Sequence, residues 1–290
     1  MNSSQAPFAI SEDQIAAIRK EGFVLLPNVL TPRQLIEWQK KLSELNEFAV
    51  GACNTQAQPT NMGFAESHGQ TLLTRVNDLF AYYPDAVLDL MASPAILNIA
   101  RGFGGEDIVP LQCDALFKQF YEHSEVLWHQ DAIHSRNFPY FNIGIYLDDA
   151  SAEDGCLELV PGSHHDVQDI RNLNNDFGWD IPGKIKVPAK AGDVIVHDMM
   201  VLHASGVKRN EKVRRTIYME MRPAIAILEQ GFQSKKWMEL RRRWMAMVLR
   251  KSGMNFHNPS YIELIKDLAN DADEFEQILA HREPPVPALY

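Results

Sequence analysis

Residues 155–163 read GCLELVPGS, a short apolar run that ends in a tight turn. The same pattern extends on both sides of this stretch. From about Ile108 the chain consists of brief apolar runs separated by turn residues. Several short strands at such spacing are typical of an all-β sandwich or barrel. The predicted strands are Val109–Tyr121, Phe141–Tyr146, Cys156–Val160, Asp193–His197 and Arg215–Met221.

The chain before this region carries the start and stop signals of helices. Hydroxyl side chains precede the apolar periodic segments, and a proline follows one of them at the first helical position. The predicted elements are a helix from Ser11 to Gly22, a strand at Phe23–Leu26, and helices at Arg33–Phe48, Ala81–Met91 and Pro94–Phe103. The polar stretch Asn54–His68 is predicted to be a mobile loop, and a candidate lid over a ligand.

A helical pattern returns after Pro223, with Trp237 and Trp244 on one side. These tryptophans are predicted to be core residues, with a dimer interface as the alternative. The basic run Arg241–Arg243 is interpreted as a solvated helix face. The whole chain, 1–290, is therefore predicted to be one mainly β domain with flanking helices and a helical extension from about residue 231.

Composition limits the classes of function. The net charge of −10 argues against a general nucleic-acid binder, which needs a basic face to displace counterions. No apolar stretch approaches the roughly 20 residues of a membrane helix, and no secretion signal is evident. Three widely spaced cysteines make a disulfide framework improbable. We expect a cytoplasmic protein, a monomer or homodimer, that binds neither nucleic acid nor membrane.

The segment Trp128-His129-Gln130-Asp131 is the first candidate for chemistry. In a strand, residues two apart point the same way, so His129 and Asp131 can share one metal ion. A histidine and a carboxylate at this spacing are two thirds of the facial triad of iron(II) oxygenases. The pair alone is weak evidence, because H-x-D occurs often by chance.

A second cluster strengthens this interpretation. His203 follows a predicted strand and can supply the third, distant ligand. Arg214 starts the next strand eleven residues later, and its planar guanidinium suits the second carboxylate of a bound 2-oxoacid. Ser205 can add a hydroxyl hydrogen bond. Arg215 faces the opposite side, so only one of the two arginines can enter the cavity.

Several motifs together resemble one known family. They are His129-Gln130-Asp131, Gly155-Cys156-Leu157 leading to Pro161-Gly162-Ser163-His164, His203-Ala204-Ser205-Gly206, and Arg214. This combination resembles the phytanoyl-CoA dioxygenase family, from the Gly22-Phe23 strand to about Met221. The resemblance implies a double-stranded β-helix, or jelly roll, with helices packed outside. Its implied cofactors are iron(II) on His129, Asp131 and His203, and the cosubstrates 2-oxoglutarate and O2.

The resemblance also implies cosubstrate contacts. Arg214 corresponds to the clamp for the 2-oxoglutarate carboxylate. Further candidate contacts are Ser205, Gln130 and Arg75, with Gln112 and Lys118 as weaker ones for cosubstrate or substrate. Arg75 could instead pair with Asp78 or Asp85. Asp131 favours hydroxylation or a related oxidation over halogenation, because related halogenases have a small residue at this position.

Other readings remain open. His123, His134, His164, His165 and His197 are each expected to be structural or surface groups. The same centre could perform desaturation, cyclisation or epimerisation on its small-molecule substrate. A non-catalytic metal-binding protein would lack a ligand or the clamp, and neither is missing. A zinc hydrolase is another alternative, but it would not explain the presence of Arg214 and Ser205. The expected substrate is a polar amine, a phosphonate or a natural-product intermediate.

Overall fold

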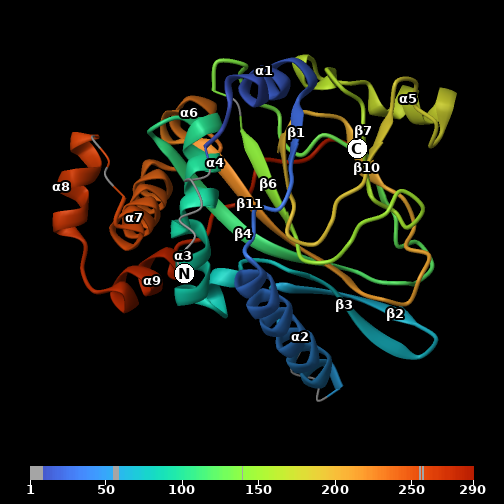
Figure 1. The fold of residues 1–290 in the computed structure, drawn as a ribbon, viewed down its shortest axis with the longest axis horizontal. Helices are drawn as coiled ribbons and strands as arrows, with labels where there is room; N and C mark the ends of the chain where they lie inside the picture. The colour runs from blue at the N-terminus through green and yellow to red at the C-terminus, as the bar shows by residue number, and fades with distance from the viewer. Residues whose placement is uncertain (1–8, 55–58, 139, 255, 257) are drawn as a thin grey trace, which may run out of the picture.

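A computed structural model of the chain describes residues 9–54, 59–138, 140–254, 256 and 258–290. The strands within these residues form two antiparallel sheets (Figure 1). The seven-stranded sheet contains, in spatial order, β1 (Phe23–Leu26), β9 (Val194–Asp198), β6 (Phe141–Tyr146), β11 (Arg214–Pro223), β4 (Ile108–Lys118), β3 (Gln70–Val76) and β2 (Met62–Ser67). The four-stranded sheet contains β5 (Val126–His129), β10 (His203–Ser205), β7 (Leu157–Leu159) and β8 (Ile185–Val187).

Helices pack around these sheets and several of them begin or end as the sequence predicts. Ser11 and Gln14 form a capping box at the start of the first helix, and Gly22 ends it with a φ of 85°. The helices are α1 (Glu12–Glu21), α2 (Pro32–Asn54), α3 (Pro84–Ala92), α4 (Pro94–Gly104), α5 (Ile170–Phe177), α6 (Ala224–Gln230), α7 (Lys235–Ser252), α8 (Pro259–Asp267) and α9 (Asp271–Ala280). Two 3-10 turns are η1 (Leu79–Ala81) and η2 (Ser163–His165).

Two apolar clusters hold the layers together. The large cluster lies between the helices and one face of the seven-stranded sheet, and it reaches from Ile18 in α1 to Ile278 in α9. A smaller cluster joins the two sheets through residues such as Tyr146, Leu157 and Ile195. A cavity lies in the remaining space between the sheets and contains the site described below.

The predicted loop at Asn54–His68 is wrong for most of its described residues. The helix α2 continues to Asn54, and β2 pairs with β3 in an antiparallel hairpin in which Phe64 lies opposite Leu73. Residues 55–58 of the predicted loop lie outside the described residues. The polar composition of this stretch misled the prediction, because cross-strand pairing satisfies the backbone of a strand whose side chains are only half-buried.

The basic run of α7 is also not a solvated face. Arg241 is 3% exposed, lies 3.6 Å from the ring centroid of Trp237, and donates a hydrogen bond to Leu111 O. Arg242 and Arg243 form ion pairs with Asp107 and Glu274. The tryptophan prediction holds, since Trp237 and Trp244 are buried. The extension is thus packed onto β4 through both its apolar and its basic side chains.

No single helix in the described part of the chain has the length and apolar composition to cross a membrane, although the bent pair α3–α4 passes that test when the two are taken together.

Candidate active site

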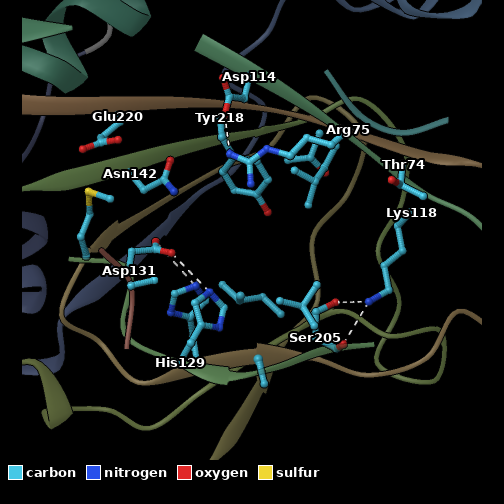
Figure 2. A pocket seen from close by; sticks show the side chains of 18 of the residues that line it. Thr74, Arg75, Asp114, Lys118, His129, Asp131, Asn142, Ser205, Tyr218 and Glu220 are labelled. Carbon is cyan, nitrogen blue, oxygen red and sulfur yellow. Dashed lines mark hydrogen bonds and ion pairs between the residues drawn. The ribbon is translucent and has the colours of Figure 1, made fainter. Parts of the chain in front are cut away.

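Three side chains that can hold a metal ion meet at the edge of the small sheet. His129 ends β5, His203 begins β10, and the two are register partners in the antiparallel pair. The carboxylate of Asp131 lies 3.3 Å from His129 Nε2 and 3.7 Å from His203 Nε2 (Figure 2). One potential ligand atom from each residue lies within 4.8 Å of the other two. The structure therefore brings together the three residues that the sequence singled out.

Backbone carbonyls fix both imidazole rings. His129 Nδ1 lies 2.7 Å from Leu127 O, and His203 Nδ1 lies 2.9 Å from Val201 O. Protons on these Nδ1 atoms donate to the carbonyls, which leaves both Nε2 lone pairs facing Asp131. Each ring is thus held in the tautomer that a metal ion requires.

Two of the three groups are shifted toward the protonation state that metal binding requires, whereas for His129 burial is outweighed by the hydrogen bond with Asp131, which raises its pKa. Burial, assisted by the neighbouring His129, lowers the pKa of His203 to about 3, so its imidazole is neutral. Burial alone would raise the pKa of Asp131, but the surrounding histidines, His203 most strongly, hold it well below its usual range. Metal ions bind neutral imidazole and ionised carboxylate.

The donor set fits iron(II). Two imidazole nitrogens and one carboxylate oxygen form the facial triad of non-haem iron sites, which leaves three coordination positions open. A structural zinc site would need a fourth protein ligand. In the described part of the chain no fourth histidine, cysteine or carboxylate joins this group.

One residue of the site was missed from the sequence. His197 was expected to be a structural or surface group, but it lines the cavity and is 2% exposed. Its Nε2 lies 3.5 Å from Asp131 Oδ2, so it can orient the carboxylate. Its neighbour Asp198 faces the other way and binds Arg136, as strand alternation requires. Alternation indicated that one of the two would face inward, but the choice between them needed the sheet.

A cationic cluster lies in the same cavity, around Ser205. Lys118 Nζ donates to Ser205 Oγ at 2.6 Å and to Ser205 O at 3.0 Å. Its register partner Arg214 is 6% exposed and donates to the carbonyls of Asp154 and Gly155 at 3.0 and 2.6 Å. Burial, with Arg214 nearby, lowers the pKa of Lys118 to about 7. Two basic side chains and a hydroxyl at one point of a buried cavity can bind a carboxylate.

Arg75 and Gln112 also line this cavity. The guanidinium of Arg75 forms an ion pair with Asp114 at 2.5 Å, rather than with Asp78 or Asp85. Half of the Arg75 side chain remains exposed, so its other N–H groups are available to a ligand. Both residues thus stay candidate contacts.

Gln130 does not line the cavity, which corrects its predicted role as a cosubstrate contact. It lies between His129 and Asp131, so its side chain points to the opposite side. There its amide donates to two backbone carbonyls and accepts from a backbone N–H, those of Asp166, Met200 and Gln168. Gln130 therefore anchors the strand that carries the metal ligands.

The other histidines named from the sequence lie outside the cavity lining. His164 contacts Arg19 O at 3.1 Å, and His134 approaches Asp198 at 3.4 Å. His123 is largely exposed, and the ring of His165 lies beside that of His164 at a tilt of 36°. Their interpretation as structural or surface groups agrees with these positions.

The cavity between the sheets has a volume of about 500 Å³. It is open to small molecules and is lined by both the triad and the cationic cluster (Figure 2). Such a fold and site define a jelly-roll oxygenase with a two-histidine, one-carboxylate metal centre.

Comparisons with known proteins identify the family. A sequence profile of the phytanoyl-CoA dioxygenase (PhyH) family matches residues 18–216, and the chain belongs to this family of 2-oxoglutarate-dependent dioxygenases. A relative from Stutzerimonas stutzeri, described as a probable alpha-ketoglutarate-dependent hypophosphite dioxygenase, is 30% identical over 197 residues. That alignment covers 62% of this chain and 68% of the relative.

Solved structures have the same fold. AviO1 from Streptomyces viridochromogenes Tue57 is 28% identical, with a TM-score of 0.60, over 75% of this chain and 96% of that one. EctD from S. alaskensis, solved with 2-oxoglutarate and 5-hydroxyectoine, is 18% identical, with a TM-score of 0.59, over 78% of this chain and 80% of that one. The predicted double-stranded β-helix is confirmed.

Proposed function

We propose that this chain hydroxylates a small organic substrate, using iron(II), O2 and 2-oxoglutarate and releasing succinate and carbon dioxide. The observation that carries the proposal is the His129–Asp131–His203 triad, which shares one buried cavity with the cluster of Arg214, Lys118 and Ser205. The EctD structure, which contains 2-oxoglutarate, supports the pairing of such a fold with this cosubstrate.

Each group has a separate task in this proposal. His129, Asp131 and His203 would hold iron(II), which supplies the oxidising chemistry together with O2 and 2-oxoglutarate. Arg214 and Ser205 bind the distal carboxylate of 2-oxoglutarate, and Lys118 adds a positive charge beside them. His197 keeps the Asp131 carboxylate in its ligating orientation. The apolar residues around the cavity exclude water from the reaction.

The substrate classes that fit the family are polar amines, phosphonates and natural-product intermediates. The same centre can also carry out desaturation, cyclisation or epimerisation, because the outcome depends on which substrate atom lies near the metal. The carboxylate of Asp131 argues against halogenation, so hydroxylation or a related oxidation is the proposed outcome. A non-catalytic role is disfavoured, since both the triad and the clamp are complete.

A screen for succinate formation tests the proposal. The purified protein is incubated with iron(II), 2-oxoglutarate and members of each substrate class, and products are identified by mass spectrometry. His129→Ala, Asp131→Ala and His203→Ala should each abolish turnover while circular dichroism stays native. Asp131→Gly should retain some iron, because two histidines remain. Near-normal turnover of any alanine variant would remove that residue from the triad.

A further inference from the structure

Residues 285–290, here called the strap, lie beside the strand that carries the metal ligands. Leu289 forms an antiparallel bridge with Gln130, with Gln130 N to Leu289 O at 3.0 Å and Leu289 N to Gln130 O at 2.9 Å. The strap therefore continues the small sheet beyond β5 and covers its edge. In Figure 1 it is the red segment that runs behind the sheets to the label C.

Side-chain packing and a hydrogen bond hold the strap in place. Val286 is 6% exposed and packs against Ala132 and Met199. Just before the strap, Pro284 O accepts a hydrogen bond from Gln233 Nε2 at 2.9 Å. Pro285 and Pro287 restrict the backbone, which lowers the entropy lost on docking. The segment thus behaves as a fixed wall.

Tyr290, at the end of the strap, contacts a residue of the metal site. Its ring stacks on that of His129, with centroids 5.3 Å apart and planes 14° apart. Its side chain still has 69% exposure, so the ring stands at the cavity mouth. Tyr290, Pro287 and Val286 all line the cavity. The strap lies beyond residues 18–216, which the family profile matches.

The large sheet presents the carboxylate of Glu220 and the side-chain amide of Asn142 on the other side of the cavity. Asn142 and Glu220 are register partners on β6 and β11, and Figure 2 places both across the cavity from His129. Arg222 donates from Nε and Nη2 to a single oxygen of Glu220, its Oε1. The Asn142 amide oxygen is fully buried, so the acceptor that this surface offers to a ligand is the Glu220 carboxylate. An uncharged or cationic donor group fits this surface better than an anion does.

We propose that the strap and the Asn142–Glu220 surface form the substrate subsite, with Tyr290 as a specificity-determining residue. The subsite takes a compact molecule whose ammonium, amide N–H or hydroxyl group points to Glu220 and whose apolar body packs against Tyr290 and Pro287. This inference rests on the proposed function, and among the substrate classes named there it favours amines over phosphonates.

The test measures binding by calorimetry to protein loaded with nickel and 2-oxoglutarate, which does not turn over. The probes are cyclohexylmethylamine, cyclohexylacetate, which replaces the amine by a carboxylate, and 1-adamantylmethylamine, which enlarges the apolar body. The wild-type protein should bind cyclohexylmethylamine at least about tenfold more tightly than cyclohexylacetate. It should also prefer cyclohexylmethylamine to the adamantyl amine by at least about tenfold, because a fixed wall excludes the larger body.

Variants distinguish the contribution of the strap from that of the Asn142–Glu220 surface. Tyr290→Ala should reduce the size preference to less than about threefold, whereas Tyr290→Phe keeps the ring and the preference. Glu220→Gln keeps an oxygen for Arg222 but removes the charge, so it should lower the amine preference by about tenfold. Phe48→Ala removes an aromatic ring of similar exposure on α2 and should change neither preference.

Tighter binding of cyclohexylacetate than of the amine by the wild-type protein would overturn the assignment of Glu220. Unchanged size selection in Tyr290→Ala would overturn the role of the strap. Failure of 2-oxoglutarate to bind to the nickel-loaded protein would instead overturn the proposed function. In that case titration of the two amines with nickel alone still decides the role of the strap, and comparison of the amine affinity between wild type and Glu220→Gln decides that of Glu220.

Discussion

Arg214 and Arg215 are neighbours in β11, but they serve opposite faces of the large sheet. Arg214 lines the cavity, whereas Arg215 binds Asp148 through Nε and Nη2, each at 2.8 Å, and donates to Gln39 O in α2. Alternation along a strand separates the two side chains in this way. The pair therefore offers a site variant and a matched control at adjacent positions.

We expect Arg214→Ala to raise the apparent KM for 2-oxoglutarate by at least about tenfold, because the carboxylate loses a charge-assisted partner. Lysine at this position should recover only part of the loss. Arg215→Ala should leave this KM unchanged but lower the free energy of unfolding by about 1–3 kcal/mol, since Asp148 loses its partner. Oxygen consumption against cosubstrate concentration measures the first effect and urea denaturation the second. A large KM effect from Arg215→Ala alone would contradict the assignment.

Lys118 predicts a pH dependence of cosubstrate binding. Burial, followed by repulsion from Arg214, lowers the pKa of Lys118 from 10.5 to about 7. Above this pH Lys118 is largely deprotonated in the free protein. Binding of a dicarboxylate favours the protonated amine, so Lys118 takes up a proton on binding. The affinity for 2-oxoglutarate should therefore fall as the pH rises from about 6 to about 9.

Lys118→Arg supplies the control for this prediction, because a guanidinium keeps its proton throughout the range. Its affinity for 2-oxoglutarate should change less with pH than that of the wild type. Calorimetry on the nickel-loaded protein in two buffers of different ionisation enthalpy measures both the affinity and the proton uptake. Equal slopes for the two proteins would show that another group controls the pH dependence.

The turn at Asp154–Gly155 is the element that positions the Arg214 clamp. Gly155 has a φ of +66°, and a Cβ there would lie 2.2 Å from Gly206 O. Its own carbonyl accepts hydrogen bonds from Arg214 and from Ser205 Oγ. The glycine thus allows the turn to approach the loop after β10 closely enough to hold both side chains.

Gly155→Ala should destabilise the protein by more than the roughly 1 kcal/mol expected from the positive φ alone, because the turn must also move away from Gly206. The displacement should raise the apparent KM for 2-oxoglutarate as well. Gly178→Ala is the control, since its φ is +55° but a Cβ there meets nothing within 4 Å. Chemical denaturation and cosubstrate titration of both variants measure these effects. Equal losses of stability would mean that the contact with Gly206 relaxes freely.

The helical extension and the β-sheets share one core at the scale of the whole molecule. Trp244 in α7 is 0% exposed, and its ring lies 4.5 Å from that of Phe80. Both belong to the apolar cluster that continues through the large sheet. We therefore expect residues 1–290 to unfold as a single domain.

Trp244→Ala should lower the free energy of unfolding by about 3–5 kcal/mol, because it leaves a large cavity in this core. Differential scanning calorimetry should show one transition in both proteins, with a lower midpoint in the variant. Phe232→Ala, at a ring with 55% exposure, should leave the midpoint nearly unchanged. A separate early transition in the variant would indicate that the extension is a domain of its own.

The features that the sequence determined are local ones. Strand alternation acts over two or three consecutive residues. It places His129 and Asp131 on one face and Arg214 and Arg215 on opposite faces. Capping residues define where α1 begins and ends, because they satisfy backbone groups close to them in the chain. Short-range geometry of this kind is contained in the sequence pattern itself, and the motifs around it were enough to indicate the family.

Only the tertiary structure decided which distant residues meet. His197 in β9 of the large sheet reaches Asp131, which follows β5 of the small sheet, because the two sheets lie face to face. Arg241 is buried because α7 packs on β4. The strap reaches His129 from more than 150 residues further along the chain. Such contacts depend on strand register and on packing between layers, which sum many weak interactions across the molecule. No short pattern near His197, Arg241 or Tyr290 carries that information.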